Sequence, residues 1–320
     1  KEMQTIFDIE DEGELEEYLG VKIQHHDDGR IEFTQPQLID SILIDLGLLA
    51  SDGSERPNTS TKDTPLMTSR VLGPDRDGPA FDYTWEYRSV IGKLNFLEKS
   101  TRPDLAYATH QCARFMADPK KSHGEAIKHI GRYLLKTRDK GFIIKPDKTQ
   151  AFECWVDADF CGNWDKDIAP TEPDTAKSRH GFVVKLHGAP ICWASKLQVQ
   201  YSLSTAESEF QGISAATRYV KSLMYLYEEI SQKVVGVPSI PTMHCRLFED
   251  NLSALEMAKI PKFRPRTRHI NVIYHHFANE VANKRILLQA IGTHYQQADY
   301  LTKPCDTATF ERHRKSVQGW

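Results

Sequence analysis

The sequence predicts an α/β fold: a mixed five-strand sheet packed with helices over residues 149–320, preceded by a helical region. Two observations predict this class. Near residue 150, the helical spacing of apolar residues gives way to short apolar and aromatic runs, which are typical of strands. From there, three strands, a long helix and two further strands alternate with helices, and this order is typical of a sheet covered by helices.

The composition is that of an ordinary globular protein. The 320 residues include 41 Lys and Arg against 44 Asp and Glu, and the net charge of -3 gives no overall nucleic-acid signature. No run of about 18 apolar residues occurs, and the acidic start lacks a signal-peptide pattern, so we expect neither a membrane span nor secretion. The six cysteines form no CxxC pair, which favours reduced thiols in a cytosolic or nuclear setting and argues against zinc.

Residues 1–66 are expected to form a β-hairpin and a short helix. An apolar strand, the turn HHDDGR and an alternating strand with Ile31 and Phe33 make up the hairpin. The segment PQLIDSILIDLGLL then has helical spacing. A stretch rich in serine, threonine, aspartate, proline and glycine follows, which predicts a linker to about residue 84.

Residues 85–148 are expected to form a helical bundle. The first helix has an apolar series at helical spacing, the second starts near Pro103, and the third has an apolar face. The third helix is also basic, and its Lys128 and Arg132 are candidates to contact a phosphate backbone. A solvated helix face explains these charges equally well.

Residues 149–320 carry the sheet. The expected strands are 152–160, 181–188, 190–196, 242–250 and 285–292. A long helix is expected over about 204–230, and further helices over 251–260, 268–284 and 298–317.

Four carboxylates lie where these elements begin or end. They lie in the first strand, at the start of the long helix, at the end of the fourth strand and at the start of the last helix: Asp157, Glu209, Asp250 and Asp299. Sites in open α/β sheets gather at such ends, so these side chains are expected to converge. Converging carboxylates repel one another unless cations neutralise them, and oxygen ligands suit magnesium or manganese. Two such ions about 4 Å apart promote phosphodiester hydrolysis.

Each carboxylate also has a structural interpretation. Asp157 in an edge strand would cap a turn, although a carboxylate inside an apolar strand favours function. Asp250 would cap the helix that follows it, and Asp299 would interact with the dipole of the last helix. Asp159 shares the face of Asp157 because side chains alternate along a strand, so it is either an outer ligand or the start of the next loop.

Two glutamates open the long helix in the stretch SLSTAESEF. Ser204 and Glu207 have the spacing of a capping box, in which the glutamate bonds the amide of the cap residue. At about 100° per residue, Glu209 lies roughly 50° from the centre of the helix's apolar stripe, and Glu207 roughly 110°. Glu209 is therefore expected to face the sheet.

Seven segments form a series along the chain: YRSVIGKLNFLEKSTRPDLAYATHQCARFM, HGEAIKHIGRYLLKT, WVDADFCGNW, KSRHGFVVKLHGAPICWASKLQVQYSLSTAESEF, FEDNLSALEMA, RTRHINVIYHHFANEV and QQADYLTKP. Together they resemble the Pol polyprotein of copia-type LTR retrotransposons, at the junction of reverse transcriptase and RNase H. The start of the chain resembles the end of the polymerase palm. The resemblance covers nearly the whole chain, in collinear order.

The resemblance implies a palm remnant at 1–66, a thumb-like or connection-like helical region at 85–148 and an RNase H-like domain at 149–320. It implies that two magnesium (or manganese) ions, held by Asp157, Glu209, Asp250 and Asp299, hydrolyse the RNA strand of an RNA/DNA hybrid. Recognition of 2′-hydroxyls across a shallow minor groove suits such a substrate. The expected partners are the hybrid and the rest of the reverse transcriptase, in a cytoplasmic virus-like particle or in the nucleus.

Basic and imidazole side chains supply further candidates. The run Lys262, Arg264, Arg266 and Arg268, with His269, is a candidate for backbone contact, and a solvated loop is the equal alternative. His294 precedes Asp299 by five residues and is a candidate for the mobile histidine of many cellular RNases H, although the copia-type pattern does not require it. His275 and His276 have apolar neighbours and are expected to be structural.

The chain departs from the family in two places. The polymerase strand Tyr-x-Asp-Asp is absent, and the paired aspartates of HHDDGR precede a glycine in a hairpin turn, so no polymerase activity is expected from this chain alone. The loop 161–180 is longer than the family's usual first connection, which leaves substrate contacts there undefined.

Two functions are open at this point. One is an RNase H-type endoribonuclease, and the other is a non-catalytic nucleic-acid-binding or structural fragment that clamps a hybrid for a partner polymerase. The complete carboxylate set favours the first, and the acidic balance and the missing palm strand leave the second open. A transposase or integrase core would need its glutamate late in the chain, but here it is second of the four.

Overall fold

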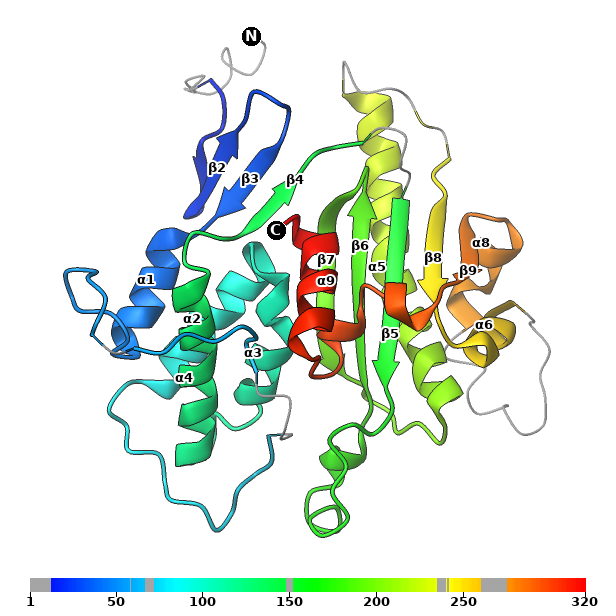
Figure 1. The fold of residues 1–320 in the computed structure, drawn as a ribbon. Helices are drawn as coiled ribbons and strands as arrows, with labels where there is room; N and C mark the ends of the chain where they lie inside the picture. Colours follow the sequence, from blue (N-terminus) through cyan, green and yellow to red (C-terminus); the bar gives the residue numbers. More distant parts are fainter. Residues whose placement is uncertain are drawn as a thin grey trace, which may run out of the picture.

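The computed structural model describes residues 13–57, 59–66, 72–147, 152–234, 240, 242–259 and 275–320. A small sheet and a group of helices lie to one side of a larger sheet (Figure 1). In the described part of the chain, no helix is both long and apolar enough to cross a membrane.

The small sheet is antiparallel, and it consists of the N-terminal hairpin strands and one strand from much later in the chain. Its strands, in spatial order, are β1 (Glu17–Tyr18), β2 (Val21–His25), β3 (Ile31–Thr34) and β4 (Phe142–Ile144). The predicted turn between β2 and β3 is confirmed, with the amide of Gly29 bonded to the carbonyl of His26. Phe142 of β4 stacks on Phe33 of β3, with ring centroids 4.7 Å apart.

The helices of the first half follow the predicted apolar spacing. They are α1 (Pro36–Asp45), α2 (Tyr87–Ser100), the short 3-10 turn η2 (Pro103–Leu105), α3 (Ala106–Ala113) and α4 (Lys121–Lys136). Val90, Ile91 and Leu94 of α2 are fully buried, as are Ile127 and Ile130 of α4. We refer to α1–α4 with η2 as the helical region.

The larger sheet confirms the predicted mixed five-strand sheet. Its strands are β5 (Phe152–Asp159), β6 (Arg179–Leu186), β7 (Ala189–Leu197), β8 (Cys245–Glu249) and β9 (Ile286–Ala290). The spatial order is β7-β6-β5-β8-β9, in which β5, β6 and β7 are antiparallel neighbours and β5, β8 and β9 run parallel. The central strand β5 therefore ends at the same edge as β8.

The two faces of this sheet have separate cores. One face packs on α5 (Thr205–Lys233), α6 (Leu252–Lys259), the 3-10 turn η5 (His275–Phe277) and α8 (Ala278–Ala282). The other face, through Trp155 and Val183, shares one apolar core with the helical region and with the C-terminal helix α9 (Thr307–Gln318). Figure 1 shows α9 and α5 on opposite sides of the sheet.

The predicted closing helix over 298–317 is wrong in its first half. Two 3-10 turns, η6 (Thr293–Tyr295) and η7 (Asp299–Leu301), precede α9, which begins at Thr307. Pro304 disfavours helical geometry in the residue before it, and Asp306 then starts α9 as its N-cap by accepting a bond from the amide of Thr309 (3.0 Å). Asp299 consequently lies in a short turn held against the sheet.

A buried polar network joins the helical region to α9. The guanidinium of Arg102 forms an ion pair with Asp104 at 2.8 Å, and both side chains are fully buried. Asp104 also accepts hydrogen bonds from Tyr133 (2.7 Å) and from Gln318 at the end of α9 (3.0 Å). Nearly all the polar atoms of this ion pair thus have partners, as a buried charge requires.

Candidate metal centre

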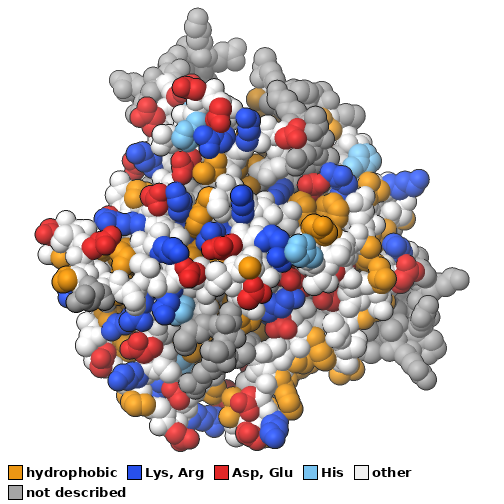
Figure 2. Space-filling view, viewed as in Figure 1, with side chains coloured by type: hydrophobic (Ala, Val, Ile, Leu, Met, Phe, Trp, Pro, Cys, Tyr) orange, Lys and Arg blue, Asp and Glu red, His pale blue; other side chains and the backbone are white. Residues whose placement is uncertain are grey.

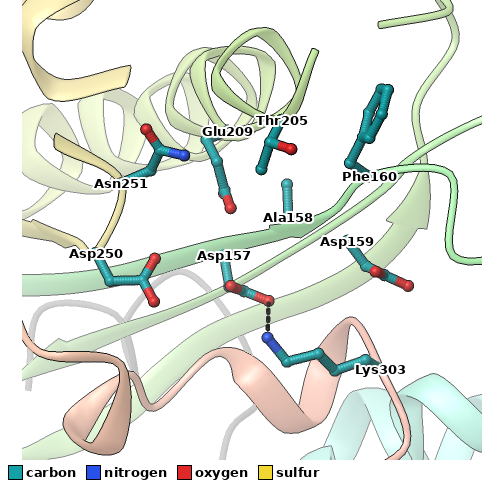
Figure 3. Close-up of a pocket in the computed structure, with 9 residues that line it drawn as sticks. All are labelled: Asp157, Ala158, Asp159, Phe160, Thr205, Glu209, Asp250, Asn251 and Lys303. Atoms are coloured by element: carbon teal, nitrogen blue, oxygen red, sulfur yellow. Dashed lines mark ion pairs between the residues drawn. The ribbon is translucent and has the colours of Figure 1, made fainter. Parts of the chain in front are cut away.

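An acidic pocket opens at the edge of the larger sheet where β5 and β8 end and α5 begins. It has a volume of about 450 Å³, and its nine lining residues are Asp157, Ala158, Asp159, Phe160, Thr205, Glu209, Asp250, Asn251 and Lys303. Figure 3 shows Glu209 descending from α5 toward Asp157, with Asp250 and Lys303 closing the other sides. Three of the four predicted carboxylates therefore line one pocket.

Asp157 lies in the centre of the sheet. Its strand β5 is flanked by β6 and β8, which excludes the edge-strand interpretation. The side chain is 2% exposed, accepts a hydrogen bond from the hydroxyl of Thr302, and lies 3.7 Å from the ammonium of Lys303. Burying a carboxylate is costly unless a partner compensates its charge, and Lys303 is such a partner for Asp157.

Glu209 faces the sheet, as its helical position predicts. It is 4% exposed, and α5 approaches β5 closely because Gly212 carries no side chain: a Cβ there would lie 3.2 Å from Val156. Glu207 instead caps the helix. Its carboxylate accepts a bond from the amide of Leu203 (2.8 Å), one residue before the predicted partner, while the hydroxyl of Ser204 accepts from the amide of Glu207.

Asp250 follows β8 directly and is not a helix cap. Asn251 takes that role, since its side-chain oxygen accepts a bond from the amide of Ala254 (3.0 Å). Asp250 accepts a hydrogen bond from Thr293 at 2.8 Å and projects into the pocket. The structural interpretation of Asp250 is therefore excluded.

Asp299 reaches the site from η7. Gln296 anchors the preceding segment by donating to the carbonyl of Val156 (2.7 Å), and a Cβ on Gly181 of β6 would lie 2.7 Å from Leu301. One oxygen each of Asp157, Asp250 and Asp299 lies within 4.8 Å of the other two. The ammonium of Lys303 lies 3.1 Å from Asp299 and bridges it to Asp157.

Sequence reasoning missed two charged groups of the site, Lys303 and Glu249. Glu249 ends β8 with no exposed surface, and one of its oxygens lies within 4.8 Å of oxygens of Glu209 and Asp250. The signal for it was available, because Glu249 is a carboxylate in an apolar strand, like Asp157. Lys303 lies four residues after Asp299, the spacing of a local ion pair, but its second partner, Asp157, lies on an element distant in sequence.

The acidic groups perturb one another's protonation. Burial and then the charge of Glu249 raise the pKa of Glu209 to about 11, and burial and then the charge of Asp157 raise the pKa of Asp299 to about 7. Burial also raises the pKa of Asp157, although the charge of Lys303 opposes it. Burial alone would lower the pKa of Lys303, but the neighbouring aspartates outweigh it and raise the pKa above its usual value.

The donor set fits a small divalent cation. One carboxylate oxygen of Glu209 and one of Glu249 are buried without a hydrogen-bond partner among the described residues. Ionised oxygens left in this state are costly unless a cation compensates them. Carboxylate-only coordination suits magnesium or manganese, so the predicted cofactors agree with the chemistry of the site.

Of the two auxiliary candidates, Asp159 lines the pocket and His294 does not. Asp159 ends β5 and lines the pocket, and burial raises its pKa. His294 is exposed in η6, next to Thr293, which bonds Asp250. The ring of His276 bonds the hydroxyl of Ser214 (3.0 Å), which agrees with its structural interpretation.

Two of the basic candidates, Lys128 and Arg132, do not line the acidic pocket. Lys128 and Arg132 are half-buried on α4, in the helical region. Their neighbours Lys136 and Arg138 form ion pairs with Asp63 and Asp40, as expected of a solvated, charge-balanced face. Figure 2 likewise shows acidic and basic side chains interspersed over the face in view.

The other predicted basic group, the run Lys262, Arg264, Arg266, Arg268 and His269, falls outside the described residues. The predicted loop 161–180 ends at residue 178, where β6 follows, and it contains the 3-10 turn η3 (Pro173–Ala176). It contacts the helical region, because Asn163 accepts a hydrogen bond from Gln111 (3.0 Å).

Comparison with curated proteins gives consistent relatives. The chain is 29% identical over 311 residues to the retrovirus-related Pol polyprotein from transposon RE1 of Arabidopsis thaliana, which covers 97% of the chain and 19% of that protein. It is 30% identical over 254 residues to the corresponding protein of transposon RE2 (79% and 16%), also from Arabidopsis thaliana. It is 28% identical over 317 residues to that of transposon TNT 1-94 of Nicotiana tabacum (97% and 22%). The chain thus spans about a fifth of the length of these relatives.

No family model matches the chain. Among solved structures, the N-terminal RNase H domain of Rv2228c from Mycobacterium tuberculosis is 14% identical, covering 52% of this chain and 97% of that chain with a TM-score of 0.32. RNase H1 from Halobacterium salinarum is 12% identical, covering 48% and 95% with a TM-score of 0.31. Likenesses this weak carry no argument by themselves.

The five strands, in the order β7-β6-β5-β8-β9 with antiparallel and parallel neighbours, form a mixed sheet, which agrees with the RNase H-like mixed five-strand sheet that the sequence predicts. The relatives match the chain along almost its whole length. The chain therefore belongs to the retrovirus-related Pol polyproteins of copia-type retrotransposons and carries their RNase H-type domain.

Proposed function

We propose that this chain is a ribonuclease H that cuts the RNA strand of RNA/DNA hybrids with the help of two divalent cations. The observation that carries the proposal is the convergence of four carboxylates from separate elements. Asp157, Glu209 and Asp250 line one pocket, and an oxygen of Asp299 lies within 4.8 Å of oxygens of Asp157 and Asp250. Such convergence destabilises the fold, because it buries groups of like charge together. Bound divalent cations would offset this repulsion and would take part in the reaction.

The four carboxylates would hold the two cations, with Asp250 common to both acidic groups. Bound magnesium or manganese supplies Lewis acidity toward a phosphodiester and lowers the pKa of a water. Asp157 is held in place by Thr302, and Asp250 by Thr293, so both side chains keep a fixed orientation. Lys303 balances the charge of Asp157 and Asp299 in the protein without bound ions.

The shape of the pocket supports an extended substrate. It is open to solvent on the sheet edge, and Phe160 and Thr205 form one wall above the carboxylates (Figure 3). A nucleic-acid backbone reaches such an open edge without entering a closed cavity. The hybrid and the rest of the reverse transcriptase are the proposed partners, in a cytoplasmic virus-like particle or in the nucleus, and the polymerase active site is expected on the remainder of the polyprotein.

Cleavage of an end-labelled RNA/DNA hybrid in magnesium tests the proposal. The native chain is compared with Asp157→Asn and with a matched control, Asp139→Asn, whose side chain is 74% exposed and pairs with Lys140. We expect cutting of the RNA strand by the native chain and the control, and loss of cutting in Asp157→Asn by at least about 100-fold.

Two outcomes would contradict the nuclease. Equal cutting by all three proteins would place the activity outside this site. Tight binding of the hybrid without cutting by the native chain would favour the non-catalytic clamp, in which the fragment serves a partner polymerase.

A further inference from the structure

Glu249 is a fifth carboxylate at the acidic centre, and its position is unusual. It is the last residue of β8, with 0% exposure, on the same face as Cys245 and Leu247, which pack in the apolar core beneath α5. Glu249 is therefore an acidic side chain at the next position on the apolar face of β8. Burying an ionisable group at such a place is costly unless it has a partner.

The partners of Glu249 are incomplete. One of its oxygens accepts a hydrogen bond from the amide of Asn251 at 3.0 Å. The other is buried without a hydrogen-bond partner in the described part of the chain, and the same is true of one oxygen of Glu209. One oxygen each of Glu209, Glu249 and Asp250 lies within 4.8 Å of the other two, so the fully buried carboxylate of Glu249 belongs to an acidic cluster.

Of the residues that the structure describes, Lys303 is the one basic side chain that lines the pocket, and it does not form an ion pair with Glu249. Lys303 forms its ion pairs with Asp157 and Asp299, which belong to the other acidic cluster. Asp250 is common to both clusters and links them at the end of β8. The cluster of Glu209, Glu249 and Asp250 therefore has three acids and no ion pair with a basic side chain among the described residues.

We propose that Glu249 is a metal ligand, which together with Glu209 and Asp250 holds one divalent cation of the centre. This deepens and rests on the proposed nuclease function, whose four predicted ligands do not include Glu249. Three carboxylates match the oxygen preference of magnesium and manganese. The added negative charge would strengthen cation binding at this position relative to a set with one acid fewer.

Manganese binding to the complete chain, without nucleic acid, tests the proposal. Free Mn²⁺ is counted by its electron paramagnetic resonance signal for the native chain, Glu249→Gln and the control Glu207→Gln, whose side chain caps α5. We expect Glu249→Gln to bind one ion at least about tenfold more weakly, a loss typical of a disturbed metal site, and Glu207→Gln to match the native chain. Native-like number and affinity in Glu249→Gln, or no Mn²⁺ binding by the native chain, would overturn the proposal.

Thermal unfolding separates a ligand from a structural acid. In EDTA, Glu249→Gln should melt above the native chain because a buried acid among other acids is gone, and in Mn²⁺ the order should reverse because the native chain gains more from the ion. A glutamine also accepts the bond from Asn251, so a purely structural Glu249 predicts no reversal. Glu249→Leu continues the apolar row and replaces the amide variant if that one fails to fold; native-like Mn²⁺ binding by it would equally overturn the proposal.

Cleavage assays keep the two proposals apart. If the native chain binds Mn²⁺ through Glu249 but cuts no hybrid, Glu249 remains a ligand and the nuclease function fails. If native and Glu249→Gln proteins cut hybrid and bind Mn²⁺ alike, the nuclease stands and the role of Glu249 fails.

Discussion

Gln318, at the end of the last helix, donates a 3.0 Å hydrogen bond to Asp104, which lies 214 residues earlier in the chain. Asp104 in turn compensates the fully buried guanidinium of Arg102. The C-terminal helix is thereby bonded to the helical region, and the two halves of the chain share a polar joint as well as an apolar core.

Breaking this joint should destabilise the whole chain. Asp104→Asn removes the negative partner of buried Arg102, and we expect a loss of about 3–5 kcal/mol in the free energy of unfolding. Urea denaturation followed by circular dichroism measures it. Asp139→Asn, at an exposed ion pair, is the control and should change stability by less than about 0.5 kcal/mol. A similarly small effect at Asp104 would show that the joint contributes little.

Substitutions of the two glutamates at the start of α5 should have different effects on cleavage. Glu209→Gln removes a proposed ligand, so hybrid cleavage should fall by at least about 100-fold without loss of folding. Glu207→Gln keeps an acceptor for the amide of Leu203, so cleavage should persist and stability should fall by less than about 1 kcal/mol. The reverse pattern would mean that the helix presents the other glutamate to the substrate.

Lys303 should stabilise the protein only when cations are absent. Lys303→Gln leaves Asp157 and Asp299 without their positive neighbour, so the melting temperature in EDTA should fall. Saturating Mg²⁺ should then raise the melting temperature of the variant more than that of the native chain, because the ions replace the lost charge. Differential scanning fluorimetry with and without Mg²⁺ reports both values, and equal shifts for the two proteins would contradict this role.

The buried His313 should make the fold sensitive to mild acid. Burial, with smaller contributions from the charges of Arg312 and His294, lowers the pKa of His313 to about 4, against about 6.5 in an unfolded chain. Between those values the unfolded chain binds the proton and the folded chain does not, so stability falls as pH falls from about 6.5 to about 4.

Replacing this histidine tests the pH dependence. Denaturant midpoints of His313→Gln should drop less between pH 7 and 4.5 than those of the native chain. His25→Gln, at the exposed end of β2, is the matched control and should keep the native pH dependence. Parallel curves for all three proteins would exclude His313 as the source.

The RNase H-like part should not be soluble when separated from the helical region. Residues 149–320 alone would expose Trp155, Val183 and Leu301, which lie in the core shared with α2, α3 and α4. We expect this fragment to aggregate or to bind the dye ANS strongly, whereas the complete chain does not. A monomeric fragment without dye binding would show that the two parts are independent domains.

The sequence predicts those features that depend on neighbouring residues. Helical spacing placed Glu209 against the sheet because the angle between two positions on one helix is fixed by geometry. The 3-10 turn at Asp299 was missed although Pro304 and Asp306 are visible signals of a later helix start. The bridge from Lys303 to Asp157 and the pairing of β4 with β3 were missed for another reason, since both depend on contacts between segments far apart in the chain.

The short turn η7 links the acidic centre to the rest of the molecule. Asp299 faces the carboxylates, whereas the next two residues, Tyr300 and Leu301, are buried in the core shared with the helical region. The helix α3 contacts η7 directly, so the packing of α3 supports the turn that holds Asp299. The placement of Asp299 beside Asp157 therefore depends on packing between the helical region and the sheet, so we expect substitutions at that distant interface to weaken the proposed centre as well as the fold.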